Sequence, residues 1–264
     1  MSEPVVLLDH PAPRVARLRI NRPAQRNAID EAVRQGFIDH LDALGRDASV
    51  RALVIGGVQG VFSAGGDVPS MLGLSEAQAR ARLGHVQQVC QRVADLRLPV
   101  VAAMEGVTAG AAVGLSLLAD RIVIGREARV LFPFLKIGLV PDWGQLLTLP
   151  RRVGLPVARR LLCGGEPVRG EEALRLGLAD ELCEDAQVMD RAVALAGELA
   201  LLPAEPFARM KQRLQHPSAT LAEELQRDQD DQAACLLGAD FREGFAAFRE
   251  KRAPDFIHRP GDRA

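Results

Sequence analysis

Two glycine-rich segments of this chain offer backbone N–H groups that could bind a negatively charged oxygen. They are residues 61–67 (VFSAGGD) and residues 100–120 (VVAAMEGVTAGAAVGLSLLAD). In each, an apolar run typical of a buried strand leads into a turn of small residues, and in the second segment a helix follows. A helix start leaves N–H groups without an intrahelical partner and favours negative charge. Two such turns that converge on one oxygen would form an oxyanion hole. The small residues Gly106, Gly110 and Gly114 are equally typical of a helix packed closely on a neighbour.

Asp142 is the candidate for proton transfer. It follows Pro141 and precedes Trp143, the single tryptophan of the chain. An acid in such a turn is often a solvated helix cap. If Asp142 instead faces an apolar pocket formed with Trp143 and Phe134, desolvation would raise its pKa and suit it to proton transfer.

The elements that must position these groups alternate between strands and helices up to about residue 180, and only helices are expected afterwards. This order predicts an α/β core over residues 1–202 and a helical extension over residues 203–264, with Pro203 and Pro206 at the boundary. The expected strands are a hairpin over 5–8 and 15–20, then 52–55, 100–104, 121–124 and 130–132. A long helix is expected over 75–96, and a last helix over 240–252 places Phe241, Phe245 and Phe248 on one packing face.

The composition excludes several classes of protein. The 264 residues are 48% hydrophobic and 25% charged, with a formal net charge of −1, which argues against nucleic acid or an anionic membrane as a partner. Four cysteines without a C-x-x-C pair and five histidines without ligand spacing predict neither disulfides nor a metal site. The N-terminus has no signal-peptide pattern, so a cytoplasmic protein is expected. Residues 100–119 are apolar enough to resemble a membrane span, but Glu105 and the glycines favour a buried strand, turn and helix. G-x-S-x-G, P-loop and dinucleotide-binding patterns do not occur in the sequence.

The chain resembles the crotonase superfamily, the enoyl-CoA hydratases and isomerases, over essentially its full length. Six landmarks in the family's order carry the resemblance. They are residues 21–28 (NRPAQRNA), 62–67 (FSAGGD), 106–112 (GVTAGAA) leading to Ala119 and Asp120, 137–142 (IGLVPD), 170–180 (GEEALRLGLAD) and 248–252 (FREKR).

The resemblance implies a spiral of repeated ββα units with a C-terminal helical region that builds trimers, often paired into hexamers. It implies an acyl-CoA substrate, with coenzyme A as part of that substrate and no further cofactor. The family's thioester oxygen is held by two backbone N–H groups, which this reading places on Ala64 and Ala111. Positions that resemble the substrate pocket are Gly110, Gly114, Phe134 and Trp143, and those that resemble coenzyme A contacts are Arg26, Ala64, Asp67, Phe248 and Lys251.

Departures from the family pattern bear on the reaction. The two glutamates with which hydratases of the family activate water fall on Gly114 and Phe134, neither of which can move a proton, so the resemblance argues against two-glutamate hydration. Asp142 matches the position of the single catalytic aspartate in certain isomerases of the family. An enoyl-CoA isomerase is therefore expected. A decarboxylase or thioesterase of the same fold, which needs mainly the oxyanion hole, and a non-catalytic acyl-CoA-binding relative remain alternatives.

Overall fold

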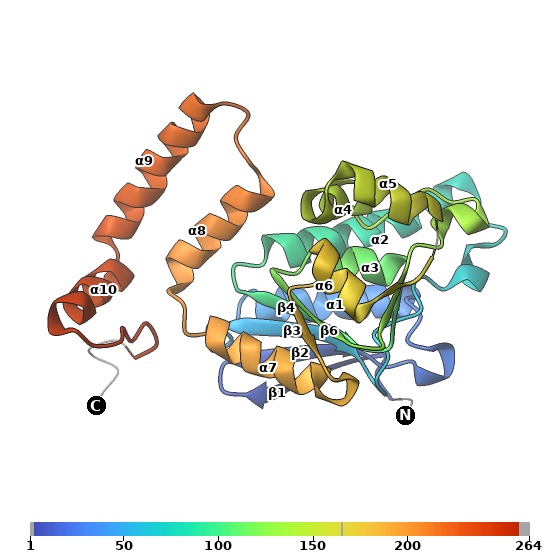
Figure 1. The fold of residues 1–264 in the computed structure, drawn as a ribbon, viewed down its shortest axis with the longest axis horizontal. Helices are drawn as coiled ribbons and strands as arrows, with labels where there is room; N and C mark the ends of the chain where they lie inside the picture. Colours follow the sequence, from blue (N-terminus) through green and yellow to red (C-terminus); the bar gives the residue numbers. More distant parts are fainter. Residues whose placement is uncertain (1–2, 165, 259–264) are drawn as a thin grey trace.

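The computed structural model describes residues 3–164 and 166–258, and in this part a six-stranded sheet forms the centre of the molecule (Figure 1). Its strand order is β1-β2-β3-β4-β6-β9. The β1–β2 pair is an antiparallel hairpin, as the sequence predicts, and the following pairs are parallel. A smaller sheet has the order β5-β7-β8. The strands are β1 (Val6–Ala12), β2 (Val15–Ile20), β3 (Ala52–Gly57), β4 (Val100–Met104), β5 (Val107–Ala109), β6 (Arg121–Gly125), β7 (Arg129–Leu131), β8 (Val168–Arg169) and β9 (Glu181–Cys183).

The helices lie on both faces of the large sheet and in an arm that extends from it (Figure 1). They are α1 (Glu31–Leu44), α2 (Glu76–Asp95), α3 (Ala111–Leu117), α4 (Gln145–Val153), α5 (Leu155–Gly164), α6 (Gly170–Leu176), α7 (Val188–Leu199), α8 (Ala204–Gln215), α9 (Leu221–Leu237) and α10 (Ala239–Glu250). Short 3-10 turns are η1 (Pro23–Gln25), η2 (Val68–Met71), η3 (Phe134–Ile137) and η4 (Asp185–Gln187).

Alternating side chains of the central strands build two separate cores. In β4, Val100, Ala102 and Met104 pack toward α1, α2 and α3, whereas Val101 and Ala103 pack toward α7. The same alternation divides β3 and β6 between the two cores. Because these strands are covered on both faces, they read as continuous apolar runs.

The predicted ββα repeat is visible in the successive units β4–β5–α3 and β6–β7–α4. In each unit the first strand joins the large sheet and the second joins the small one. Strands β5 and β7 pair in parallel, so equivalent turns of the two units come to one side of the molecule. This arrangement is an α/β spiral of the predicted class.

The boundaries of the predicted elements agree with the structure to within a few residues, but strands β5, β8 and β9 were not predicted, and β9 follows the point after which only helices were expected. Strands of two or three residues are too short to give a periodic signal. The Ser75 side chain caps α2 through a reciprocal bond with Gln78, so the helix begins at Glu76. The last helix ends at Glu250 because Lys251 has a left-handed backbone with φ 55°.

Helices α9 and α10 stand apart from the core, while α8 connects them to it (Figure 1). In α9 no described side chain is buried, and in α10 only Ala247 is. The predicted phenylalanine face is exposed, and Phe241 and Phe245 contact each other with ring centroids 6.2 Å apart.

Lys211 fastens α8 to the sheet, and its removal should be costly. Its side chain is 3% exposed, and Nζ donates to the Leu98 carbonyl at 3.1 Å and to the Asp120 carboxylate at 2.9 Å. We expect Lys211→Met to lower the free energy of unfolding by about 3 kcal/mol, because the carboxylate loses its partner. Chemical denaturation measures the change, and Gln212→Met on the exposed face of α8 should leave stability nearly unchanged. Equal stability of the two variants would contradict this role.

Candidate active site

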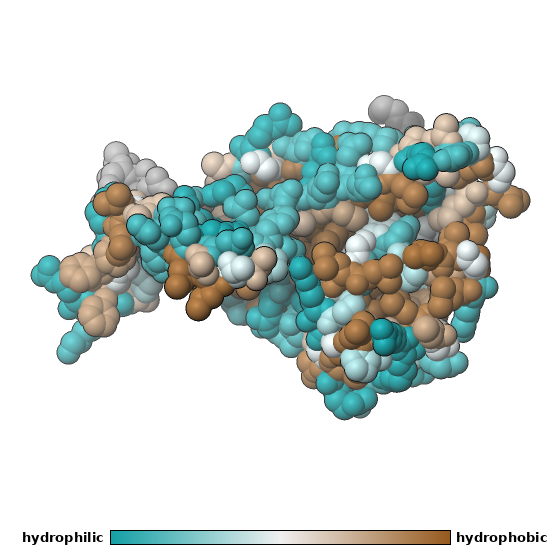
Figure 2. Space-filling model, turned by 90° about the horizontal axis from the view of Figure 1, so that it is seen from above, coloured by the Kyte–Doolittle hydropathy of each residue, from teal (hydrophilic) through white to brown (hydrophobic). Residues whose placement is uncertain are grey.

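A cavity of about 520 Å³ lies where the two glycine-rich turns, α1, α2 and the segment after β7 meet. Its lining is mostly apolar, and the charged residues in it are Arg34, Arg82 and Asp142. Exposed apolar side chains surround it, among them Val68, Leu139 and Val140. Figure 2 shows apolar residues gathered over the core, away from the arm of α9 and α10. An apolar cavity with few polar groups is typical of a small-molecule site.

A short backbone ladder holds the two glycine-rich turns together. The N–H of Phe62 donates to the Glu105 carbonyl at 2.9 Å, and that of Ser63 to the Val107 carbonyl at 3.0 Å. The N–H of Ala109 then donates back to the Ser63 carbonyl at 3.0 Å. The two turns are therefore neighbours, as the predicted arrangement requires.

Gly65 allows the turns to approach this closely. Its φ is +97°, and a Cβ atom there would lie 2.6 Å from the Ala109 carbonyl oxygen and 3.6 Å from the Ala111 nitrogen. Any larger residue would separate the turns, so glycine is needed both for its backbone conformation and for the space.

The structure corrects one of the two predicted oxyanion donors. The Ala64 N–H donates to the Arg26 carbonyl at 2.9 Å, and the Gly65 N–H to Ser63 Oγ at 3.0 Å. The next N–H, that of Gly66, donates to no group in the described chain, and Gly66 lines the cavity. Spacing alone cannot tell which of three successive N–H groups in a turn is left free, so the prediction of Ala64 was wrong by two residues.

Ala111 keeps its predicted place. It is the first residue of α3, lines the cavity, and its N–H has no acceptor among the described groups. The neighbouring Gly110 N–H donates to the Leu131 carbonyl at 3.0 Å, which fixes the start of the helix to β7. Gly110 lines the cavity beside Ala111, as predicted.

The loop that accepts from Ala64 is organised by Asn27, a residue to which the sequence reading gave no separate role. Asn27 is fully buried, and its amide donates to the carbonyls of Val58 and Val61 at 3.0 and 2.7 Å. Its Oδ1 accepts from the Arg22 N–H at 3.0 Å. Its backbone is left-handed with φ 58°, which asparagine tolerates better than most residues. The family-like segment 21–28 therefore positions the first turn.

Asp142 lies in the wall of the cavity and is not a solvated cap. Its Oδ1 atom is buried and has no hydrogen-bond partner in the described structure. Burial raises the pKa of Asp142 to about 6, against smaller opposing effects of a hydrogen bond from its own backbone and of the charges of Arg82 and Arg34. A carboxyl group with a pKa near neutrality can both take and return a proton.

Gln145 joins the Asp142 turn to the second glycine-rich turn. It is fully buried, and its Nε2 donates to the Gly110 carbonyl at 3.1 Å and to the Asp142 carbonyl at 3.0 Å. The sequence gave no sign of this bond.

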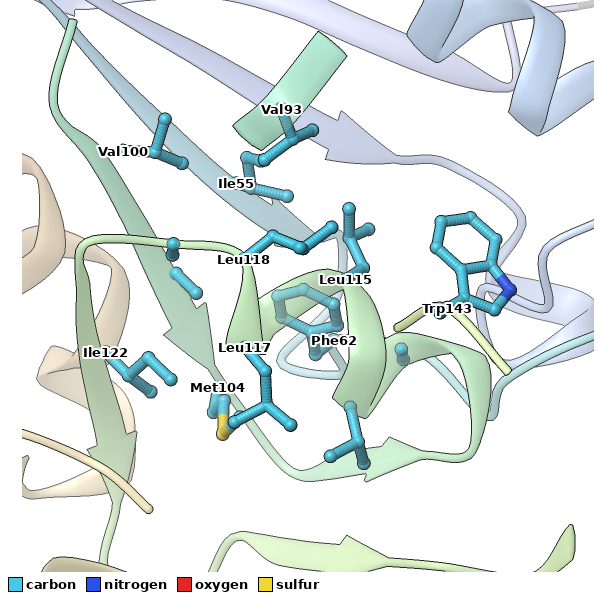
Figure 3. Packing of buried hydrophobic residues seen from close by; sticks show 14 of the residues in the cluster. Ile55, Phe62, Val93, Val100, Met104, Leu115, Leu117, Leu118, Ile122 and Trp143 are labelled. Atoms are coloured by element: carbon cyan, nitrogen blue, oxygen red, sulfur yellow. The ribbon is translucent and has the colours of Figure 1, made fainter. Parts of the chain in front are cut away.

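Gly114 is placed differently from the prediction that it lines the substrate pocket. It is buried inside α3, where a Cβ atom would overlap that of Trp143 and lie 2.9 Å from the Trp143 carbonyl oxygen. Figure 3 shows Trp143 beside α3, near Leu115. Trp143 and Phe134 do line the cavity and are 5% and 7% exposed. The first hydratase position is thus sealed by packing, and the second carries an apolar ring.

Of the residues predicted to contact coenzyme A, Arg26, Ala64 and Asp67 lie around the first turn, whereas Phe248 and Lys251 are not brought near them within one chain (Figure 1). Arg26 is exposed beside the first turn, and Asp67 pairs with Arg22 at 3.4 Å. Phe248 is 82% exposed, and both it and Lys251 lie at the end of the arm, outside the cavity lining (Figure 1).

Within residues 3–164 and 166–258, no group of three or more histidine, cysteine or acidic side chains has the geometry of a metal site. Among the helices of the same residues, none combines the length and the apolar character that crossing a bilayer requires.

Comparisons with known proteins find relatives over almost the whole chain. The family model of enoyl-CoA hydratase/isomerase matches residues 12–259. The 2,3-dehydroadipyl-CoA hydratase of Escherichia coli K12 is 32% identical over 246 residues, covering 92% of this chain and 95% of that protein. The 1,2-epoxyphenylacetyl-CoA isomerase of the same strain is 31% identical over 261 residues, covering 95% and 97%. The crystal structure of an enoyl-CoA hydratase from Polaromonas sp. JS666 has a TM-score of 0.89 and 27% identity, covering 95% and 98%.

The sealed position of Gly114 predicts that even one added methyl group destabilises the protein. We expect Gly114→Ala to lower the free energy of unfolding by about 1–3 kcal/mol, because the Trp143 segment must move. Gly84→Ala is the matched control, since Gly84 lies within α2 with no atom within 4 Å of an added Cβ. That change should stabilise by about 0.5–1 kcal/mol through helix propensity. Calorimetry of thermal unfolding measures the stability of both variants. A Gly114→Ala variant as stable as wild type would show that the space between α3 and Trp143 is not closed.

Proposed function

The chain belongs to the enoyl-CoA hydratase/isomerase family of acyl-CoA enzymes, and we propose that within it the protein is an isomerase that moves a double bond along an acyl thioester. Relatives bear hydratase as well as isomerase names, so family membership alone leaves the reaction open. The proposal rests on one observation. Asp142 is the single carboxylate among the described residues that line the cavity.

One carboxylate is enough for a double-bond shift. Asp142 takes a proton from C2 of a 3-enoyl thioester, and the electrons of that C–H bond delocalise onto the thioester oxygen. The resulting dienolate is stabilised by the N–H groups of Gly66 and Ala111, which interact more strongly with the developing charge than with the neutral carbonyl. Asp142 then returns the proton to C4, which leaves the double bond between C2 and C3.

The same arrangement is poorly suited to adding water through two glutamates. Such an addition needs one group to activate water and another to protonate carbon. At the first position Gly114 leaves no room for a side chain, and at the second Phe134 supplies an apolar ring.

The arm formed by α9 and α10 supports the proposal that the protein forms an oligomer. Its apolar residues Phe241, Phe245 and Phe248 are exposed in the single chain, and a soluble protein normally covers such a face. We propose that α9 and α10 pack on neighbouring copies in a trimer or a pair of trimers. Phe248 and Lys251 would then reach the coenzyme A part of a substrate bound to another subunit. Arg26 and Asp67 would contact the coenzyme A part of the substrate bound to their own subunit.

Replacement of the carboxylate tests the reaction directly. We expect Asp142→Asn to lower kcat for a 3-enoyl-CoA by at least about a thousandfold, because proton transfer at both carbons is lost. The Kd of a saturated acyl-CoA should stay within a few fold of the wild-type value. Asp39→Asn, at an exposed position on α1, is the control and should retain full activity.

Absorbance at the wavelength of the conjugated 2-enoyl thioester follows the reaction, and mass analysis identifies the product. Retained isomerisation in Asp142→Asn would refute the assignment. Loss of carbon dioxide from a malonyl-type thioester, or release of free coenzyme A, would favour the decarboxylase or thioesterase alternative. Binding of thioesters without turnover would favour a non-catalytic relative.

The raised pKa of Asp142 predicts opposite effects of pH on activity and stability. Since the ionised carboxylate is the base, kcat/KM should rise with pH through about 6 and then level off. Because the folded-state pKa lies above the ordinary aspartate value of 3.8, ionisation disfavours the folded state, and stability falls as pH rises from about 4 to 6. Asp142→Asn should therefore be more stable than wild type at pH 8 by about 2–3 kcal/mol, with little difference below pH 4. Urea unfolding at the two pH values measures this, and a destabilised variant at pH 8 would contradict it.

A further inference from the structure

Arg34 is a buried cation in the cavity wall that the proposed reaction does not use. It lies on the inner face of α1 and is only 3% exposed. Its Nε atom is buried without a hydrogen-bond partner, and no ion pair of the described residues involves it. Burial lowers the pKa of Arg34, although an arginine remains charged at any physiological pH. A guanidinium without a partner in an apolar wall is costly unless a ligand supplies that partner.

A second arginine lines the same cavity from α2. Arg82 is half-buried, and its Nη1 donates to Ser70 Oγ at 3.2 Å. Its Nη2 lies 3.7 Å from where a Cβ on Gly66 would stand, so it is close to the first glycine-rich turn. Arg82 is near enough to disfavour the charge of Arg34, and it helps to lower the pKa of that guanidinium. The cavity therefore has a cationic region beside the proposed thioester site.

In the described structure, no acid near this region forms an ion pair with Arg34 or Arg82. Asp30 and Asp67 both pair with Arg22, at 3.2 and 3.4 Å. Glu31 is exposed in the first turn of α1. Asp142 interacts with both arginines only at longer range, and no ion pair within 4.0 Å joins them in the described structure. Among the described residues that line the cavity, the two arginines carry two positive charges and the ionised Asp142 carries one negative charge.

We propose that the acyl group of the substrate carries a carboxylate, which binds between Arg34 and Arg82, so that the preferred substrates are thioesters of short dicarboxylic acids. This inference rests on the proposed function for the presence of an acyl thioester and adds the chemical class of the acyl group. The planar guanidinium of Arg34 offers paired donors that match a carboxylate. A plain alkyl chain would leave these donors unpaired in an apolar wall.

Binding of saturated thioesters tests the inference without any turnover. Calorimetry is used to compare succinyl-, glutaryl- and adipyl-CoA with butyryl-, valeryl- and hexanoyl-CoA, because the matched pairs differ only in the terminal group. At least one dicarboxylic thioester should bind about tenfold or more tightly than its alkyl counterpart, as expected for hydrogen bonds to charged groups. The ω-carboxamide of that thioester should lose most of the gain, which separates charge from hydrogen bonding.

Variants assign the effect to the two arginines. Arg34→Met should abolish the preference for the dicarboxylic thioester and leave the affinity for the alkyl thioester unchanged or improved. Arg82→Gln, at a half-exposed position that tolerates substitution more readily, should reduce the same preference. Arg80→Gln is the control, because Arg80 is exposed on α2 and pairs with Glu76 at 2.8 Å. Circular dichroism and unfolding curves establish that each variant is folded.

Each outcome bears on one of the two proposals. Equal affinity for dicarboxylic and alkyl thioesters would overturn this inference and leave the proposed function intact. An equal loss of affinity for both kinds of thioester in Arg34→Met and Arg82→Gln would also overturn it, and would place the arginines on coenzyme A. A change confined to the pH profile of turnover would make Arg34 a positioning residue for Asp142. Failure of every thioester to bind would refute the proposed function itself.

Discussion

The proposed chemistry depends on three backbone hydrogen bonds that join the loop after β3 to the β4–β5 turn and strand β5. They connect Phe62 and Ser63 to residues 105–109, and so bring two segments about 45 residues apart in the sequence together at the edge of the cavity. Everything that surrounds the proposed thioester site is placed relative to this ladder. Gly65 allows the two turns to approach each other, and the Asn27 side chain holds the loop after β3 in place. Helix α3 begins where the ladder ends. Main-chain groups held in this way lose little freedom when charge develops beside them, which is the basis of electrostatic preorganisation.

Packing, as much as the presence or absence of acids, determines which proton transfers the cavity can support. Trp143 occupies the space above Gly114, and its neighbour Asp142 is turned into the cavity, where the surrounding apolar residues raise its pKa. One short segment therefore closes one potential acid position and supplies another. The same apolar surroundings make the charge of Arg34 energetically costly. A ligand that supplies a hydrogen-bond partner to its guanidinium would offset this cost.

The sequence predicted the architecture well because its signals are local and repeated. Apolar runs marked the buried strands, Ser75 and Gln78 marked a helix start, and the order of glycine-rich turns fixed the fold class. Details that depend on three-dimensional contacts were not predictable in this way. Which N–H of the first turn remains free depends on the carbonyl of Arg26, and the burial of Gly114 depends on Trp143. Arg34 was not selected either. It lies three residues before Phe37 and so shares the apolar face of α1, but an arginine is normally expected to reach solvent.

The two hydrogen bonds donated by the Gln145 amide connect two parts of the proposed active site. Because one buried side chain donates to the carbonyls of both Gly110 and Asp142, it links the turn that carries the base to the turn that carries the Ala111 N–H. Gln145 is the first residue of α4, so this helix is tied to both turns at its start. The cavity walls formed by α1, α2 and the exposed segment at Leu139 and Val140 take no part in these two bonds. Side chains in these walls can be exchanged to suit different acyl groups without altering the bonds of Gln145, so that selectivity and catalysis can diverge independently.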